Sequence, residues 1–397
     1  MKTKIKQIYT RLCACAVFRG VLSQPLFTLF NEYCKAGECV EEKMNAYAAF
    51  VSEIYAQGGV LTDVVKTLVF SDENVYVKSV AHKTSIPEKV AQAAEKELQA
   101  FGEFASLTTE DFAEDMSVSV NDLPAFDSFN ADMVAAYSDI LRNLHKYGYG
   151  IFSPYSMFRF TDGKQIEPII SADKTQLSQF VGYEEERGQV LANTRAFLEG
   201  KPAANTLLCG DAGAGKSSTV KAVANAFFDE GLRLIELRKD QLRYLPEVMG
   251  KISGNPLKFI IFIDDLSFYQ NDDNFGMLKA ALEGSASAMA DNAVIYATSN
   301  RRHIIKETFS DRDGDDVHRN DTMQETLSLS ERFGLTVLFS KPNKQLYLHI
   351  VKELAKRFEI VMDEKELEVQ AEAFALRKGN RSARAAEQFI NQLISRK

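Results

Sequence analysis

The sequence predicts an α/β fold in which helices cover a parallel sheet, with a mainly helical region before the sheet and a small helical region after it. Short apolar runs alternate with amphipathic segments from residue 183 to residue 339. Helical patterns alone occur before about residue 150 and after residue 343. Strands separated by helices of this length pair in parallel, and such a sheet needs helices on both faces.

The first region has the pattern of a helical bundle. Apolar residues recur at helical spacing over 41–56 and 60–70, and Pro87 begins a helix rich in Ala, Glu, Lys and Gln that runs to residue 104. A further amphipathic helix is expected over 133–147, where glycines end it. The acidic stretch 107–129 is expected to be a hinge or an exposed loop.

The elements of the α/β region follow in order along the chain, after two strand patterns over 150–160 and 166–170. The expected helices cover 184–199, 217–228, 240–251 and 274–283, and the expected strands cover 206–209, 232–237, 259–263, 293–297 and 335–339. Three helices follow over about 343–358, 363–377 and 381–395. We therefore divide the chain into a mainly helical domain (1–150), a linker whose strands lead into the next domain (151–174), an α/β domain (175–340) and a helical lid (341–397).

A phosphate-binding loop lies between the first strand after residue 183 and the helix that follows it. Residues 210–217 are Gly-Asp-Ala-Gly-Ala-Gly-Lys-Ser, which is the Walker A pattern. Glycines let consecutive backbone N–H groups face a phosphate, the lysine adds charge, and the serine hydroxyl serves Mg²⁺. The sequence therefore predicts ATP and Mg²⁺ as cofactors, with the nucleotide bound by Gly210, Asp211, Ala212, Gly213, Ala214, Gly215, Lys216, Ser217 and Ser218.

Two carboxylates follow the apolar strand at 259–263. Asp264 and Asp265 match a Walker B arrangement, in which the first acid holds Mg²⁺ and the second orients or deprotonates the attacking water. Ser217 and Asp264 are therefore the expected magnesium ligands, and Asp265 is the expected catalytic acid. Many related ATPases carry the longer Glu at the second position, so slow turnover is compatible with Asp265.

Later segments resemble AAA+ ATPases. Residues 296–300 (Tyr-Ala-Thr-Ser-Asn) resemble the sensor 1 region, residues 330–334 (Ser-Glu-Arg-Phe-Gly) the arginine-finger box, and residues 381–386 (Arg-Ser-Ala-Arg-Ala-Ala) the sensor 2 region. Together with 180–186 and 197–205, they make residues 175–397 similar to a bacterial AAA+ family known as domain of unknown function 815.

The resemblance implies roles for residues outside the phosphate loop. Asn300 would position the attacking water together with Asp265, and Arg384 would contact the γ-phosphate bound to its own chain. Arg381, one turn away, is an alternative for Arg384. Arg332 would reach the γ-phosphate bound by a neighbouring subunit, which implies a homo-oligomer completed in trans.

The same resemblance implies nucleotide contacts from Val181 and Gly182, and a client that is either protein or nucleic acid. Lys and Arg number 47 against 55 Asp and Glu, so any nucleic-acid contact has to be a local patch. No apolar run reaches the roughly 18 residues of a membrane span, and the stretch 12–18 is short for a signal peptide. Five cysteines, an odd number, do not suggest a disulfide framework. These features predict a cytoplasmic protein without a membrane partner.

Two functions remain open from the sequence. The first is a Mg-dependent AAA+ ATPase that hydrolyses ATP to move or remodel a macromolecular partner. The second is a nucleotide-gated binding module with little or no hydrolysis. This function remains possible because Asp265 stands where related ATPases carry Glu. Asn300, Arg332 and Arg384 together favour the first, because a protein that only binds nucleotide needs no groups for the transition state.

Overall fold

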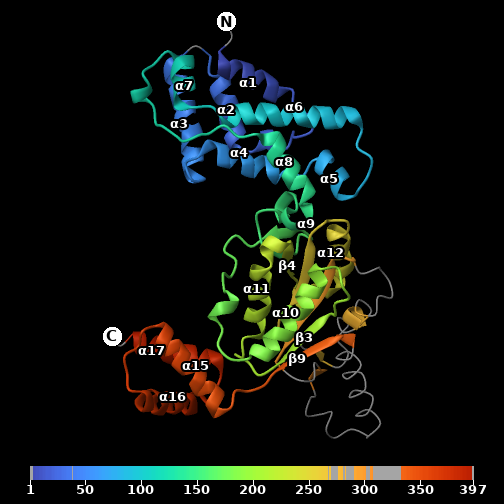
Figure 1. Cartoon of the computed structure of the whole chain (residues 1–397), viewed down its shortest axis with the longest axis vertical. Coiled ribbons are helices and arrows are strands. Elements are labelled where there is room, and N and C mark those ends of the chain that lie inside the picture. The colour runs from blue at the N-terminus through green and yellow to red at the C-terminus, as the bar shows by residue number, and fades with distance from the viewer. Residues whose placement is uncertain are drawn as a thin grey trace. The chain divides into compact units, whose positions relative to one another are not determined.

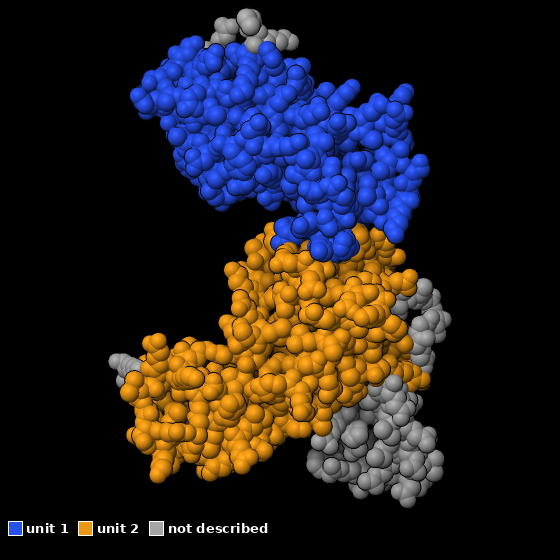
Figure 2. All heavy atoms as spheres, viewed as in Figure 1, with its two compact units in different colours: residues 1–154 blue, residues 155–397 orange. Residues whose placement is uncertain are grey.

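The computed structural model describes residues 3–37, 39–266, 268–269, 276–279, 282, 290–300, 305–306 and 332–395. The chain divides into two compact units, Met1–Pro154 and Tyr155–Lys397, which Figure 2 shows in different colours. Each unit has a hydrophobic core of its own. Within the ranges just given, no helix has the length and apolar character needed to cross a membrane.

The first unit is built of helices, as the sequence predicts. Figure 1 shows them as α1 (Lys4–Cys13), α2 (Pro25–Lys35), α3 (Val40–Ala56), α4 (Leu61–Phe70), α5 (Val75–Ala81), α6 (Glu88–Ala105), α7 (Thr109–Met116), α8 (Met133–Arg142) and α9 (Leu144–Tyr147). Aromatic side chains from four of these helices, Phe30, Phe50, Phe104 and Phe112, are each at most 1% exposed. The rings of Phe30 and Phe104 have centroids 4.7 Å apart, and such pairs add about 0.5–1.5 kcal/mol beyond burial. These contacts join α2, α3, α6 and α7 in one core.

The expectation of a hinge or loop over 107–129 is wrong for its first part. α7 begins there with a capping box, in which the Thr108 and Asp111 side chains each accept from the other residue's backbone N–H. Of its acidic residues, Glu110 and Glu114 are exposed, whereas Asp111 and Asp115 pair with Lys4 and Lys43. Phe112 and Met116 are buried. A capping box followed by an amphipathic turn was the signal for a helix.

The second unit contains a seven-stranded sheet in the order β2-β1-β4-β5-β7-β3-β9. Its strands are β1 (Met157–Phe160), β2 (Ile166–Pro168), β3 (Thr206–Gly210), β4 (Leu232–Glu236), β5 (Lys258–Ile263), β7 (Ala293–Ser299) and β9 (Leu335–Phe339). All neighbours pair in parallel except β1 and β2. Every residue of β3 and β7 is buried, as expected for a sheet covered on both faces. The predicted α/β fold class is confirmed.

β1 and β2 lie in the segment that the sequence assigns to a linker, 151–174. β1 pairs in parallel with β4, where Phe158 lies opposite Ile235, and β2 returns antiparallel to β1. The segment therefore extends the sheet instead of merely connecting two domains. The sequence predicts strands here, but strand pairing across more than 70 residues leaves no local signal.

The helices of the second unit are α10 (Glu184–Leu198), α11 (Lys216–Ala226), α12 (Leu245–Ile252), α15 (Lys344–Arg357), α16 (Glu364–Lys378) and α17 (Ala383–Ile394). The helix expected over 240–251 is divided into a 3-10 helix (Lys239–Tyr244) and α12, because Pro246 takes the first turn of a new helix. Of the helix expected over 274–283, residues 276–279 and 282 are described and are helical, and the other half lies outside the described residues. β6 (Phe268–Tyr269) pairs with β8 (Ile305–Lys306). α15, α16 and α17 pack on one another as the helical lid, around Tyr347, Ala371 and Phe389.

Candidate nucleotide-binding site

The loop between β3 and α11 has a backbone that requires glycine at three positions. Gly210, Gly213 and Gly215 have φ angles of +136°, +81° and +89°, a region that residues with a side chain rarely adopt. A Cβ atom at Gly210 would stand 2.0 Å from the carbonyl oxygen of Phe339 in β9. The loop therefore owes its shape to its glycines and to the close approach of β9.

The loop leads directly into α11, and the N-terminal end of that helix faces the loop. Asp211 and Ala212 are exposed, Ala214 is buried, and Ser217 and Ser218 lie in the first turn of α11. The first N–H groups of a helix have no partner within the helix, and its dipole favours negative charge at that end. A glycine loop before a helix start is the backbone arrangement that binds phosphate.

Lys216, the first residue of α11, is only 5% exposed. Its ammonium group donates hydrogen bonds to the carbonyl oxygens of Gly210 at 2.8 Å and Asp211 at 2.9 Å, and to Oδ1 of Asn300 at 3.0 Å. Burial lowers the pKa of Lys216, while neighbouring carboxylates, Asp211 first among them, oppose that shift. The lysine charge is thus held by neutral oxygens, and among the described residues no carboxylate contacts it directly.

Asp264 ends β5 beside the helix start. Its Oδ1 accepts from the hydroxyl of Ser217 at 2.6 Å, the hydroxyl of Thr298 at 2.5 Å and the backbone N–H of Asp265 at 3.1 Å. The two residues predicted to hold Mg²⁺ are therefore in direct contact. A carboxylate and a hydroxyl are hard oxygen donors of the kind that Mg²⁺ takes, so the donor set fits the ion.

Asp265 has a φ of +52°, in the left-handed region that an aspartate tolerates at a cost. Its backbone N–H donates to the hydroxyl of Thr298 at 2.9 Å, which holds the residue in that conformation. The side-chain amide of Asn300 donates to Oδ1 of Asp265 at 2.7 Å. Asn300 thereby connects the carboxylate of Asp265 to the ammonium group of Lys216.

Thr298 is a site residue that our sequence reasoning does not single out. It is 2% exposed and contacts both acids through one hydroxyl group. Thr298 lies in β7, and Asn300 follows the end of that strand, so no local pattern singled out this threonine.

The segment before α10 brings the lid close to the core. A Cβ atom at Gly182, whose φ is +75°, would stand 2.8 Å from Cδ1 of Leu346 in α15. Val181 packs against the lid core, and the hydroxyl of Tyr183 donates to the carbonyl of Ser340 at 2.7 Å. The guanidinium of Arg187 donates to the Gly182 carbonyl. Val181 and Gly182 are thus wedged between the α/β core and the lid.

The lid also meets the phosphate loop itself. The backbone N–H of Arg384 donates to the carbonyl of Gly213 at 3.3 Å, and the Arg384 side chain is exposed. Arg381 differs, because its guanidinium makes two hydrogen bonds to the Glu372 carboxylate, at 2.7 and 3.0 Å. Those bonds raise the pKa of Arg381. Of the two arginines that could contact the γ-phosphate, Arg381 is therefore already paired with Glu372 inside the lid.

Arg332 lies three residues before β9 and is half-buried. β9 runs parallel to β3, with Leu335 opposite Thr206 and Phe339 opposite Gly210. The phosphate loop follows the far end of β3, so about 13 Å of strand separates it from the end where Arg332 lies. Ser330 and Glu331, the first two residues of the segment that resembles the arginine-finger box, lie outside the described residues.

A family model described as "Protein of unknown function (DUF815)" matches residues 153–397, and most of the first unit lies outside that match. This confirms the family resemblance, and the seven-stranded sheet covered by helices agrees with the α/β fold class that the resemblance implies. Among solved structures, the chain is similar to the RuvB Holliday junction branch migration motor of Thermotoga maritima, with 13% identity and a TM-score of 0.34 over 54% of this chain and 71% of that chain. A variant of that motor gives 12% identity and 0.35 over 54% and 72%. Values this low carry no information about a shared substrate. No curated protein matches the chain.

Proposed function

We propose that the chain, which belongs to the DUF815 family, is an AAA+ ATPase that binds Mg·ATP and hydrolyses it to move or remodel a macromolecular partner. The observation that carries this proposal is the environment of Lys216. Its buried ammonium group contacts three neutral oxygens at the start of a helix. A buried cation whose contacts in the described part of the chain are all neutral favours an incoming anion, and the glycine loop before α11 suits a phosphate.

The contact between Ser217 and Asp264 supports the magnesium part of the proposal. Their hydrogen bond of 2.6 Å would open, and both oxygens would then turn to the ion. When bound with the nucleotide, Mg²⁺ would neutralise charge on the phosphates. In this assignment the loop from Gly210 to Gly215 surrounds the phosphates, and Val181 and Gly182 contact the rest of the nucleotide.

We assign hydrolysis to a second group of side chains. Asp265 would orient or deprotonate the attacking water, and Asn300, already bonded to its carboxylate, would hold that acid in place. Arg384 would stabilise the γ-phosphate within the chain, since its backbone contacts the phosphate loop. Arg332, which precedes the amino end of β9 and so lies at the other end of these strands from that loop, would act on the nucleotide of a neighbouring subunit.

Calorimetry of ATP binding tests the first step. Lys216→Ala should weaken ATP binding by about 10-fold to 100-fold or more, the range expected for losing a hydrogen bond from a charged group. Lys221→Ala is the matched control, because Lys221 lies on the same helix but pairs with Glu236. Unchanged ATP affinity in Lys216→Ala would remove the basis of the proposed function.

Mixing two inactive variants tests hydrolysis and the role of Arg332 in trans. Asp265→Asn keeps the arginine, and Arg332→Ala keeps the acid, so a mixed oligomer contains some interfaces with both groups intact. Phosphate release should return in part when the two are mixed. Mixed oligomers that form but stay inactive would show that Arg332 does not act in trans.

The alternative function is a nucleotide-gated binding module, which the short acid at Asp265 leaves open. Single-turnover measurement of phosphate release separates the two functions. A binding module would bind ATP and let it dissociate before any phosphate is released. The identity of the client, the number of subunits and the cytoplasmic location remain predictions.

A further inference from the structure

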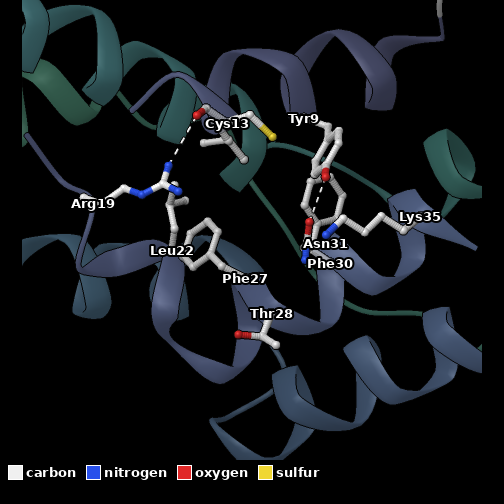
Figure 3. Close-up of a pocket in the computed structure, with 10 residues that line it drawn as sticks. Tyr9, Cys13, Arg19, Leu22, Phe27, Thr28, Phe30, Asn31 and Lys35 are labelled. Atoms are coloured by element: carbon white, nitrogen blue, oxygen red, sulfur yellow. Dashed lines mark hydrogen bonds between the residues drawn. The ribbon is translucent and has the colours of Figure 1, made fainter. Parts of the chain in front are cut away.

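The first unit contains a cavity between α1 and α2 that the proposed nucleotide site does not use. Its volume is about 340 Å³, at the lower end of the range for ligand pockets. Figure 3 shows its lining, which consists of Tyr9, Leu12, Cys13, Arg19, Leu22, Phe27, Thr28, Phe30, Asn31 and Lys35.

The floor of the cavity is apolar and firmly built. Leu12, Phe27 and Phe30 are each at most 3% exposed and belong to the core of the unit. Tyr9 stands edge-on to Phe30, with ring centroids 6.2 Å apart, and its hydroxyl donates to Oδ1 of Asn31 at 2.7 Å. The wall therefore holds its shape without a ligand, and among the lining residues the partly exposed Tyr9 and Leu22 offer apolar surface to a ligand.

The rim is cationic. Two of the lining residues, Arg19 and Lys35, are basic, and none is acidic. Other cations nearby are already paired, Lys4 with Asp111 and Arg11 with Glu103. Arg19 instead donates to the carbonyl of Cys13 at 3.3 Å, and Lys35 has no ion pair with any residue in the described part of the chain. In Figure 3, Arg19 and Lys35 lie on opposite sides of the apolar side chains Leu22, Phe27 and Phe30.

We propose that this cavity binds an acidic peptide segment of a partner protein. An apolar side chain of the peptide occupies the floor, and acidic residues on either side of it approach Arg19 and Lys35. The open rim, where Cys13, Arg19, Thr28 and Lys35 are exposed, suits a passing chain better than an enclosed small molecule.

The same surface suits nucleic acid poorly. Binding of single strands relies on aromatic faces that stack with bases, but Phe27 and Phe30 are buried in the core of the unit. The inference concerns the first unit and holds whether or not the chain hydrolyses ATP.

Fluorescence polarisation with the full chain tests the charge and the apolar contact together. The probe is a labelled peptide Glu-Asp-Leu-Phe-Asp-Glu, compared with Gln-Asn-Leu-Phe-Asn-Gln and with Glu-Asp-Ala-Ala-Asp-Glu. The first should bind at least threefold more tightly than either of the others. Lys35→Gln and Arg19→Gln should each weaken it about threefold or more, whereas Lys89→Gln, an exposed lysine on α6 outside the cavity, should not.

Thiol labelling of the unaltered protein gives a second readout that does not depend on a variant's folding. Cys13 lines the cavity, whereas Cys39, also exposed, does not. Burial raises the pKa of both Cys15 and Cys34 to about 12, so these thiols react slowly near neutral pH. The acidic peptide should slow the reaction of Cys13 with N-ethylmaleimide and leave that of Cys39 unchanged, as mass spectrometry would measure.

Three results would overturn the inference. The first is equal affinity for the acidic and neutral peptides. The second is equal slowing of labelling at Cys13 and Cys39. The third is protection of Cys13 by a 20-nucleotide single strand of DNA or RNA but not by the peptide, which would make the cavity a nucleic-acid site.

Discussion

Replacing Gly213 by alanine should detach the lid from the phosphate loop, and the same change at Gly215 provides the control. A Cβ atom at Gly213 would stand 3.2 Å from Cβ of Arg384 and 3.3 Å from Oγ of Ser382. At Gly215 the nearest atom is a ring carbon of Phe180 at 4.0 Å. The φ angles are similar, +81° and +89°, so both variants strain the backbone but only one displaces α17.

The size of the effect follows from these contacts. A left-handed conformation costs a residue with a side chain about 1–2 kcal/mol, and both variants bear that cost. Gly213→Ala also loses the hydrogen bond from the Arg384 N–H to the Gly213 carbonyl, at 3.3 Å. A typical bond of this kind contributes about 1 kcal/mol. The Arg384 amide should therefore become about fivefold less protected in Gly213→Ala alone.

Hydrogen exchange followed by mass spectrometry measures this protection in peptides that cover 380–390. The nucleotide-free full chain is used, so that no ligand holds the lid in place. Equal exchange in the two variants, or no change in either, would refute the reasoning. The lid would then be held mainly where Gly182 meets Leu346.

Three further changes test other parts of the chain. Gly188→Ala in α10 has no atom within 4 Å of the added Cβ, so the better helix former should raise the free energy of unfolding in urea by about 1 kcal/mol; a decrease would contradict this. Glu97→Gln should lower the free energy of unfolding by about 2 kcal/mol, because the Glu97 carboxylate accepts hydrogen bonds from the backbone N–H groups of residues 16–18. An unchanged urea midpoint would argue that these hydrogen bonds do not stabilise the unit. Burial opposes ionisation of Asp115, but hydrogen bonds, chiefly from Lys43, hold its pKa below the ordinary 3.8. The stability that ionised Asp115 contributes is therefore present above pH 3.8 and is lost as pH falls through its lower pKa in the folded state. Lys43→Met should lose less free energy of unfolding than the wild type over this acid range, as unfolding at a series of pH values would measure.

The sequence could predict the parts of the site that depend on local pattern. The glycine loop and Lys216 are contiguous, and Asp264 follows a continuous apolar strand, so spacing alone predicts that they converge at the carboxyl edge of a parallel sheet. Thr298 was missed because its two hydrogen bonds depend on how β5 and β7 align. The place of β1 beside β4 was missed for the same reason, since pairing partners distant in sequence leave no periodic signal.

The contacts of Asn300 would connect phosphate binding at Lys216 with Asp265, the acid that we propose to be catalytic. An ammonium group has three donors, and those of Lys216 are occupied by Gly210, Asp211 and Asn300. A phosphate oxygen that binds Lys216 must therefore replace one of them. Two are carbonyls fixed in the loop backbone, whereas Asn300 contributes only a side chain, which is the easier to displace. Because that amide also bonds to Asp265, any movement of Asn300 changes how the acid is held. One side chain thus links the arrival of the nucleotide to the geometry of the residue proposed to act on water.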